Sequence, residues 1–190
     1  MESKGSDQLK KRKNGRLAVT LLIIIAILVG YLWYRDFDNY RELPDCENLL
    51  EGTVNKNFSI ETNGIAKHKT TGLKWYRCNA GQRFNNGKCT GKILVFNWKE
   101  AMKFPSEISK NSAVTWRLPT NDEIQSLKQE KCRNPALDKT IFPGIEVANY
   151  WTSTVSRRGA LFGCSFYSYE GRISCLMRKE KYHPLMLILE

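Results

Sequence analysis

The chain has 190 residues, of which 42% are hydrophobic and 26% are charged, and its 30 Lys and Arg against 19 Asp and Glu give a net charge of +11. It contains no internal repeat and no low-complexity segment, so we expect one globular domain with a single sizeable core. The first 16 residues hold six cations and two anions, which leaves 24 cations, 17 anions and a net +7 for the rest. That excess fits ordinary solubility charge, and it also fits a surface for polyanions such as acidic polysaccharide, lipid headgroups or nucleic acid.

A long apolar segment follows a basic N-terminal tail. Residues 1–16 are polar and basic, whereas residues 17–34 carry no charge. At 1.5 Å per residue this segment spans roughly 27 Å, close to the hydrocarbon thickness of a bilayer. Tyr31, Trp33 and Tyr34 lie at its far end, where amphipathic aromatic rings favour the membrane interface. The positive-inside rule then places the tail in the cytoplasm and the rest of the chain outside.

We expect residues 17–34 to be an uncleaved anchor. A cleaved signal peptide is the alternative, but bulky residues rather than a small-x-small site follow the apolar run. A pilin-like leader lacks the Glu expected at the fifth mature position. The expected organisation is a tail at 1–16, an anchor at 17–34, a stem at 35–57 and an extracytoplasmic domain at 58–190. The expected location is the bacterial inner (cytoplasmic) membrane, with that domain in the periplasm.

All the cysteines follow the anchor, and their number is even. Such a set in an exported domain predicts disulfides, whereas a zinc site would need CxxC pairs, which are absent. The expected pairs are Cys78–Cys89, Cys164–Cys175 and Cys46–Cys132. The first brackets the hairpin turn signal Asn86-Gly87, and a four-residue loop over 168–171 would align the second. The third pair consists of the two remaining cysteines and would link the stem to the body across a long stretch of sequence.

Two helices are predicted by capping boxes. Asn97 with Glu100 begins one helix, whose length Pro105 should limit. Its expected buried face is Trp98, Ala101, Met102 and Phe104. Thr120 with Glu123 begins the other, expected over 121 to about 130, directly after the Pro119 corner that ends a strand-like segment.

Most of the remaining body is expected to form short strands separated by turns. The predicted strands are 73–76, 93–96, 150–155, 160–167, 172–178 and 185–189. The last of these is apolar on both faces, which is typical of a central buried strand. Two helices followed by antiparallel strands indicate an α+β fold.

Six strings in fixed order carry a resemblance to a known family: TTGLKWYRC (70–78), GQRFNNGKCTG (81–91), FNWKEAMKF (96–104), WRLPTNDEI (116–124), CRNPALDKTIFP (132–143) and NYWTST (149–154). Residues 58–190 resemble the Lcl C-terminal domain family, formerly a domain of unknown function. The resemblance implies a C-type-lectin-like fold, with two helices around a small antiparallel sheet. It also implies a binding module rather than an enzyme, since members of the collagen-like adhesin type recognise sulfated, acidic glycans.

The motif residues are expected to be structural: Trp75, Trp116, Arg117, Thr120, Glu123 and Trp151. A buried Arg117 would need a carboxylate partner, and Glu123 is the nearest candidate. The calcium-dependent sugar site of true C-type lectins uses EPN or QPD with a WND-like triplet, and these strings are absent. We therefore expect no metal and no cofactor.

We expect no catalysis either. His68 and His183 have no partner at metal-binding spacing, and no G-x-S-x-G, P-loop or HExxH string occurs. Formylglycine-generating enzymes share the RLPT string, but their active site needs a reactive cysteine pair and a different helix sequence after it. Here NDEIQSL follows, and the cysteines suit structural pairs.

Basic and aromatic residues late in the chain are the candidate ligand-binding set: Arg157, Arg158, Tyr167, Tyr169, Arg172, Arg178 and Lys179, with Lys181 beside them. Arginine can fork onto sulfate or carboxylate, and tyrosine can stack on a sugar face. A solvated loop face is the alternative interpretation. The expected partner is an acidic polysaccharide, and nucleic acid is not expected. The alternative function is a protein-interaction subunit of an envelope complex or a periplasmic immunity protein.

Overall fold

The computed structural model describes residues 19–36, 43–50 and 55–190. The chain divides into two compact units, Met1–Leu43 and Pro44–Glu190. In the first unit the helix Val19–Asp36 is long and apolar enough to cross a membrane or to act as a signal anchor. The basic tail at 1–16 lies outside the described residues.

The second unit includes part of the expected stem. The short helix α2 (Cys46–Leu50) is preceded by a parallel bridge between Asp45 and Arg133. The Cys46 amide donates to the Arg133 carbonyl at 2.7 Å. Of the range 35–57, the described residues from Pro44 onward thus belong to the compact body, because this backbone contact and a disulfide tie them to it.

A five-stranded antiparallel sheet brings both ends of the body together. Its strands, in spatial order, are β1 (Phe58–Ile60), β2 (Ile65–His68), β3 (Lys74–Tyr76), β10 (Ile188–Leu189) and β6 (Trp116–Arg117). Ile188 of β10 lies opposite Trp75 on one side and Arg117 on the other. The run 185–188 is fully buried, so the expected central position is confirmed, although the regular strand is only two residues long.

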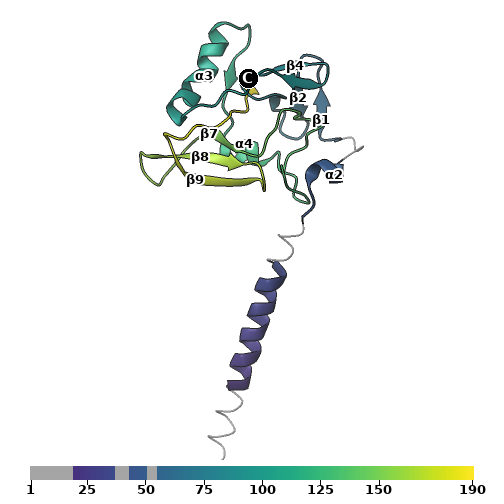
Figure 1. The fold of residues 1–190 in the computed structure, drawn as a ribbon, viewed down its shortest axis with the longest axis vertical. Helices are drawn as coiled ribbons and strands as arrows, with labels where there is room; N and C mark the ends of the chain where they lie inside the picture. Colours follow the sequence, from purple (N-terminus) through teal and green to yellow (C-terminus); the bar gives the residue numbers. More distant parts are fainter. Residues whose placement is uncertain (1–18, 37–42, 51–54) are drawn as a thin grey trace, which may run out of the picture. The chain divides into compact units, whose positions relative to one another are not determined.

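Two smaller sheets complete the body. The strands β4 (Arg83–Asn85) and β5 (Lys88–Thr90) form a hairpin whose turn residues Asn86 and Gly87 both have positive φ, 47° and 80°. The other sheet has the order β7 (Asn149–Val155), β8 (Phe162–Tyr167) and β9 (Arg172–Arg178). Figure 1 shows these three strands together on one side of the body and the helix α3 (Trp98–Lys110) on the other.

That long helix, α3 (Trp98–Lys110), corrects a prediction. Its capping box from Asn97 and Glu100 forms as expected, but the helix continues through Pro105 to Lys110. Proline removes one backbone donor from a helix interior, at a cost of about 3 kcal/mol. Here Pro105 is buried and the Ser109 hydroxyl donates to its carbonyl at 2.7 Å, so the helix forms despite the local penalty.

The second helix, α4 (Asn121–Gln125), is shorter than the predicted 121–130. After the cap at Ser126, the amides of Leu127 and Lys128 each donate to the carbonyl three residues earlier. The Gln129 amide donates to the Ala136 carbonyl instead, so the helix does not continue. The predicted strand 93–96 is also absent from the sheets. Only Phe96 pairs there, in a single bridge to His183.

The core of the body consists of two clusters of buried residues. Trp75, Tyr150 and Phe166 centre one, and Trp151 with Leu185 centres the other. Trp75 and Trp151 are fully buried. All three expected disulfides are confirmed: Cys46–Cys132, Cys78–Cys89 and Cys164–Cys175. The body is therefore a mixed helix-and-sheet domain built on small antiparallel sheets.

Candidate functional site

The residues predicted to bind a ligand lie at opposite ends of the β7–β8–β9 sheet. Tyr167 pairs with Arg172 at the β8–β9 turn, whereas Phe162 pairs with Arg178 at the other end of the same two strands. Six residues of β8 separate these ends, roughly 17–20 Å at about 3.3 Å per residue. The structure therefore does not bring the whole predicted set into one site.

Five cations meet at one end, which we call the basic end: Arg157, Arg158, Arg178, Lys179 and Lys181. The β7–β8 loop carries the first two, and both are exposed. Ser156 fastens this loop to β9, because its hydroxyl donates to the Cys175 carbonyl at 2.6 Å. The Lys179 amide donates to the Leu161 carbonyl at 2.9 Å. These backbone contacts place two segments about twenty residues apart in the sequence beside one another.

The cations of the basic end differ in how far they are neutralised. Arg178 forms an ion pair with exposed Glu180, and its hydrogen bond holds the pKa of that carboxyl below the usual range. The Lys179 ammonium lies 4.1 Å from the centre of the Trp98 ring, a cation–π contact that positions the ammonium group and leaves its charge uncompensated. The other three cations form no ion pair within the described part of the chain.

Exposed apolar side chains border the same end of the sheet. Val155 ends β7, Leu161 precedes β8 and Leu176 lies on β9, with exposed fractions of 67%, 63% and 59%. The basic end is therefore an amphipathic surface.

The opposite end of the sheet is aromatic, and part of its charge is already balanced. Tyr167 and Tyr169 stack with their ring centres 6.0 Å apart. Arg172 pairs with Glu170 at 2.7 Å, and the Arg133 guanidinium lies 5.7 Å from the centre of the Tyr169 ring. We therefore place the candidate anion site at the basic end.

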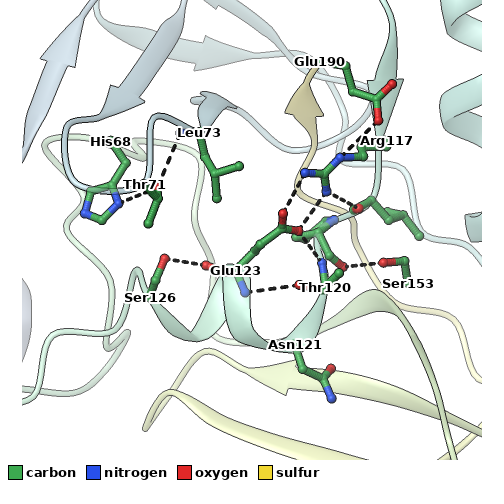
Figure 2. Close-up of polar contacts among 12 residues, drawn as sticks. His68, Thr71, Leu73, Arg117, Thr120, Asn121, Glu123, Ser126, Ser153 and Glu190 are labelled. Atoms are coloured by element: carbon green, nitrogen blue, oxygen red, sulfur yellow. Dashed lines mark hydrogen bonds and ion pairs between the residues drawn. The ribbon is translucent and has the colours of Figure 1, made fainter.

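The corner formed by the WRLPT string is a connected polar network (Figure 2). Arg117 donates through both terminal nitrogens to Glu123, at 2.8 and 2.7 Å, which confirms the expected partner. Glu123 also accepts from the Thr120 amide at 2.8 Å, as the capping box requires. The hydrogen bond from Arg117 is the main cause that holds the pKa of Glu123 below its usual value. Arg117 is half-buried rather than buried, with its side chain 32% exposed.

Two features of this corner were not predicted from the sequence. Glu190 also pairs with Arg117, at 3.3 Å from Nε, and no local pattern indicates a contact between residues so far apart. A groove of about 480 Å³ opens beside the pair, between α3, β6, the start of α4 and β7. Trp116 was expected to be structural, yet it is half-buried and lines this groove.

The two histidines have structural surroundings. His68 shares a hydrogen bond of 2.9 Å between its Nδ1 and the Thr71 hydroxyl, and the His183 ring packs on Trp151 with centres 4.9 Å apart. Burial lowers the pKa of both rings. Over residues 19–36, 43–50 and 55–190, no three His, Cys, Asp or Glu side chains gather at metal-binding distance.

Comparison with known proteins supports the resemblance that the six strings indicate. No curated protein matches the chain. The Lcl C-terminal domain family matches residues 64–188, about two thirds of the chain and all six strings. The chain therefore belongs to the Lcl C-terminal domain family.

Proposed function

We propose that this protein is a membrane-anchored, extracytoplasmic binding module that recognises acidic or sulfated glycans at the basic end, without catalysis. The apolar helix Val19–Asp36 suits an uncleaved anchor in a bacterial inner membrane, with the body in the periplasm. Small antiparallel sheets accompanied by α3 and α4 suit a C-type-lectin-like fold.

The single observation that carries the proposal is the convergence of cations at the basic end. The β7–β8 loop and the end of β9 supply arginine and lysine together, and Glu180 is the one carboxylate paired with them among the described residues. Guanidinium groups can bind sulfate or carboxylate oxygens in pairs, and such charge-assisted hydrogen bonds are stronger than neutral ones. A chain of sulfated or acidic sugars presents those groups at repeated intervals.

Heparin affinity chromatography of the full-length protein in detergent tests this function. We expect Arg157→Glu/Arg158→Glu to weaken retention by about tenfold, since two attractive pairs become repulsive and each exposed pair contributes about 0.2–1 kcal/mol. The matched control is Arg83→Glu/Lys88→Glu in the exposed β4–β5 hairpin, which changes the net charge equally. Equal losses of heparin retention in both variants would show that only the overall charge matters, which would contradict a site at the basic end.

A protein partner is the second candidate function, and the exposed apolar side chains favour it. Val155, Leu161 and Leu176 at the basic end would be buried by a protein surface more effectively than by a polyanion. Leu161→Ser/Leu176→Ser distinguishes the two functions. Loss of a crosslinked partner with heparin retention unchanged supports the envelope-complex or immunity role, and a glycan array provides the complementary measurement.

A further inference from the structure

We infer a second binding site, for an uncharged pyranose sugar unit, in the groove beside the Arg117–Glu123 pair. Its volume of about 480 Å³ lies within the range of small-ligand pockets, roughly 300–1,000 Å³. Residues of four elements line it, and Met102, Ser106, Trp116 and Ser153 contribute in addition to the ion pair. The inference is independent of the basic end, which none of these residues belongs to.

The charges of the groove disfavour an ionic ligand. The Arg117 guanidinium is compensated by Glu123 in a two-point contact and by Glu190 at 3.3 Å. An anionic ligand would approach two carboxylates, and a cationic ligand would have to compete with the guanidinium that already holds Glu123 at two points. An uncharged ligand avoids both costs, because it does not have to break the pair in order to bind.

The ion pair still offers hydrogen-bonding groups of both kinds. A guanidinium has five N–H donors, and three hydrogen bonds, to Glu123 and the Leu118 carbonyl, use both donors of Nη1 and one of Nη2. The Nε donor faces Glu190 in an ion pair, so one donor on Nη2 is left among the described contacts. Within the described residues, Glu123 Oε1 accepts the bond from Arg117 alone, whereas Oε2 also accepts the Thr120 amide. A donor and an acceptor held on one rigid pair match neighbouring sugar hydroxyls, each of which can both donate and accept.

The remaining walls suit the apolar and hydroxyl faces of a sugar ring. Trp116 is half-buried, and its ring is held by an edge contact with Tyr76, with centres 5.6 Å apart. An indole fixed in this way gives a flat surface for the C–H face of a pyranose. Ser153 Oγ donates to the Pro119 carbonyl and can still accept, and Ser106 is exposed on α3.

Saturation-transfer NMR on the full-length protein tests the site with a panel of uncharged methyl pyranosides of the glucose, galactose, mannose and N-acetylglucosamine types. The detergent must have no sugar headgroup. We expect transfer to at least one pyranoside, at equal strength in low and high salt. Ser106→Phe fills the groove from an exposed position, so the affinity should fall by about tenfold or more.

Three further variants complete the design. Met102→Trp narrows the groove from a second, 39% exposed position and should reproduce the loss if Ser106→Phe perturbs the fold. Glu107→Phe on α3, which does not line the groove, and Arg157→Glu/Arg158→Glu should both bind normally. Absence of transfer to every pyranoside, or transfer that survives both groove variants, overturns the site. Neither result affects heparin retention, so it leaves the proposed function at the basic end standing.

Discussion

Arginine lies in two different electrostatic environments at the WRLPT corner and at the basic end. At the corner, Arg117 is half-buried, and its charge is compensated by Glu123 and Glu190. At the basic end, Arg157 and Arg158 are exposed and form no ion pair within the described residues. The charge of an arginine next to a carboxylate is compensated within the protein, whereas the charge of one without a carboxylate is available to an external anion. Nearby acidic groups, rather than the number of cations, therefore decide which arginines we propose for binding.

Removing the corner carboxylate should have the largest effect on stability. Glu123→Ala leaves Arg117 without its two-point partner and deletes half of the α4 capping box, so we expect a loss of about 2–3 kcal/mol. Urea unfolding of the full-length protein measures it. Asp122→Ala, one residue away and exposed, is the matched control and should cost less than about 0.5 kcal/mol. Similar losses for the two variants would show that the pair does not stabilise the corner.

A conservative change at the same corner should have a smaller effect. Arg117→Lys keeps the charge but cannot make the two-point contact with Glu123, and we expect a loss of about 1 kcal/mol. The comparison is with Arg157→Lys, which should leave the unfolding free energy unchanged, because exposed substitutions usually stay within about 0.5 kcal/mol. An unchanged unfolding midpoint for Arg117→Lys would mean that a positive charge at this position stabilises the corner without the two-point geometry.

Lowering the pH should reduce the stability contributions of His183 and Glu123 in different pH windows. Burial, and secondarily Lys181, lowers the pKa of His183 beside the basic end, so the unfolded state binds the proton more readily. Its contribution is complete above the unfolded pKa of about 6.5 and is lost as the pH falls through the lower folded value. Glu123, whose pKa is lowered chiefly by Arg117, loses its contribution only below about 4.3.

Unfolding midpoints across a pH series test this order. His183→Phe keeps a ring against Trp151 and should flatten the first decline, but not the second. A residual slope in the first window is expected from His68, whose pKa burial also lowers. If His183→Phe leaves the first decline intact and only Glu123→Gln changes it, the assignment of the windows is wrong.

Removing the carboxylate of the Arg178–Glu180 pair at the basic end should have the smallest effect. Glu180→Gln removes the carboxylate that Arg178 pairs with, so the number of uncompensated cations rises. We expect heparin affinity to increase by about twofold only, since an exposed ion pair is weak. Glu107→Gln on α3 removes the same charge outside the basic end and should change retention less. A decrease in affinity for Glu180→Gln would mean that the pair positions Arg178 for binding.

Local interactions made several features of the fold predictable. The capping boxes at Asn97 and Thr120 form as expected, because each involves residues three positions apart. The hairpin at Asn86-Gly87 and the β8–β9 turn align their disulfides for the same reason. The continuation of α3 through Pro105 was not predictable, because the helix packs against β6 and β7, which come later in the sequence.

The sequence by itself determined the family, the two cysteine pairs that bracket hairpins and the helix starts, since each rests on motifs or on contacts between residues close in the sequence. The Cys46–Cys132 pair spans 86 residues and followed only because two cysteines remained. Only the tertiary structure decided which cations lie near one another. The length of β8 separates Tyr167 from Arg178, and strand pairing brings Lys179 to the Leu161 backbone. The groove beside Trp116 likewise exists only when four elements from different parts of the chain meet. Spacing along a chain sets local hydrogen bonds, whereas a binding surface is defined by side chains that packing brings together.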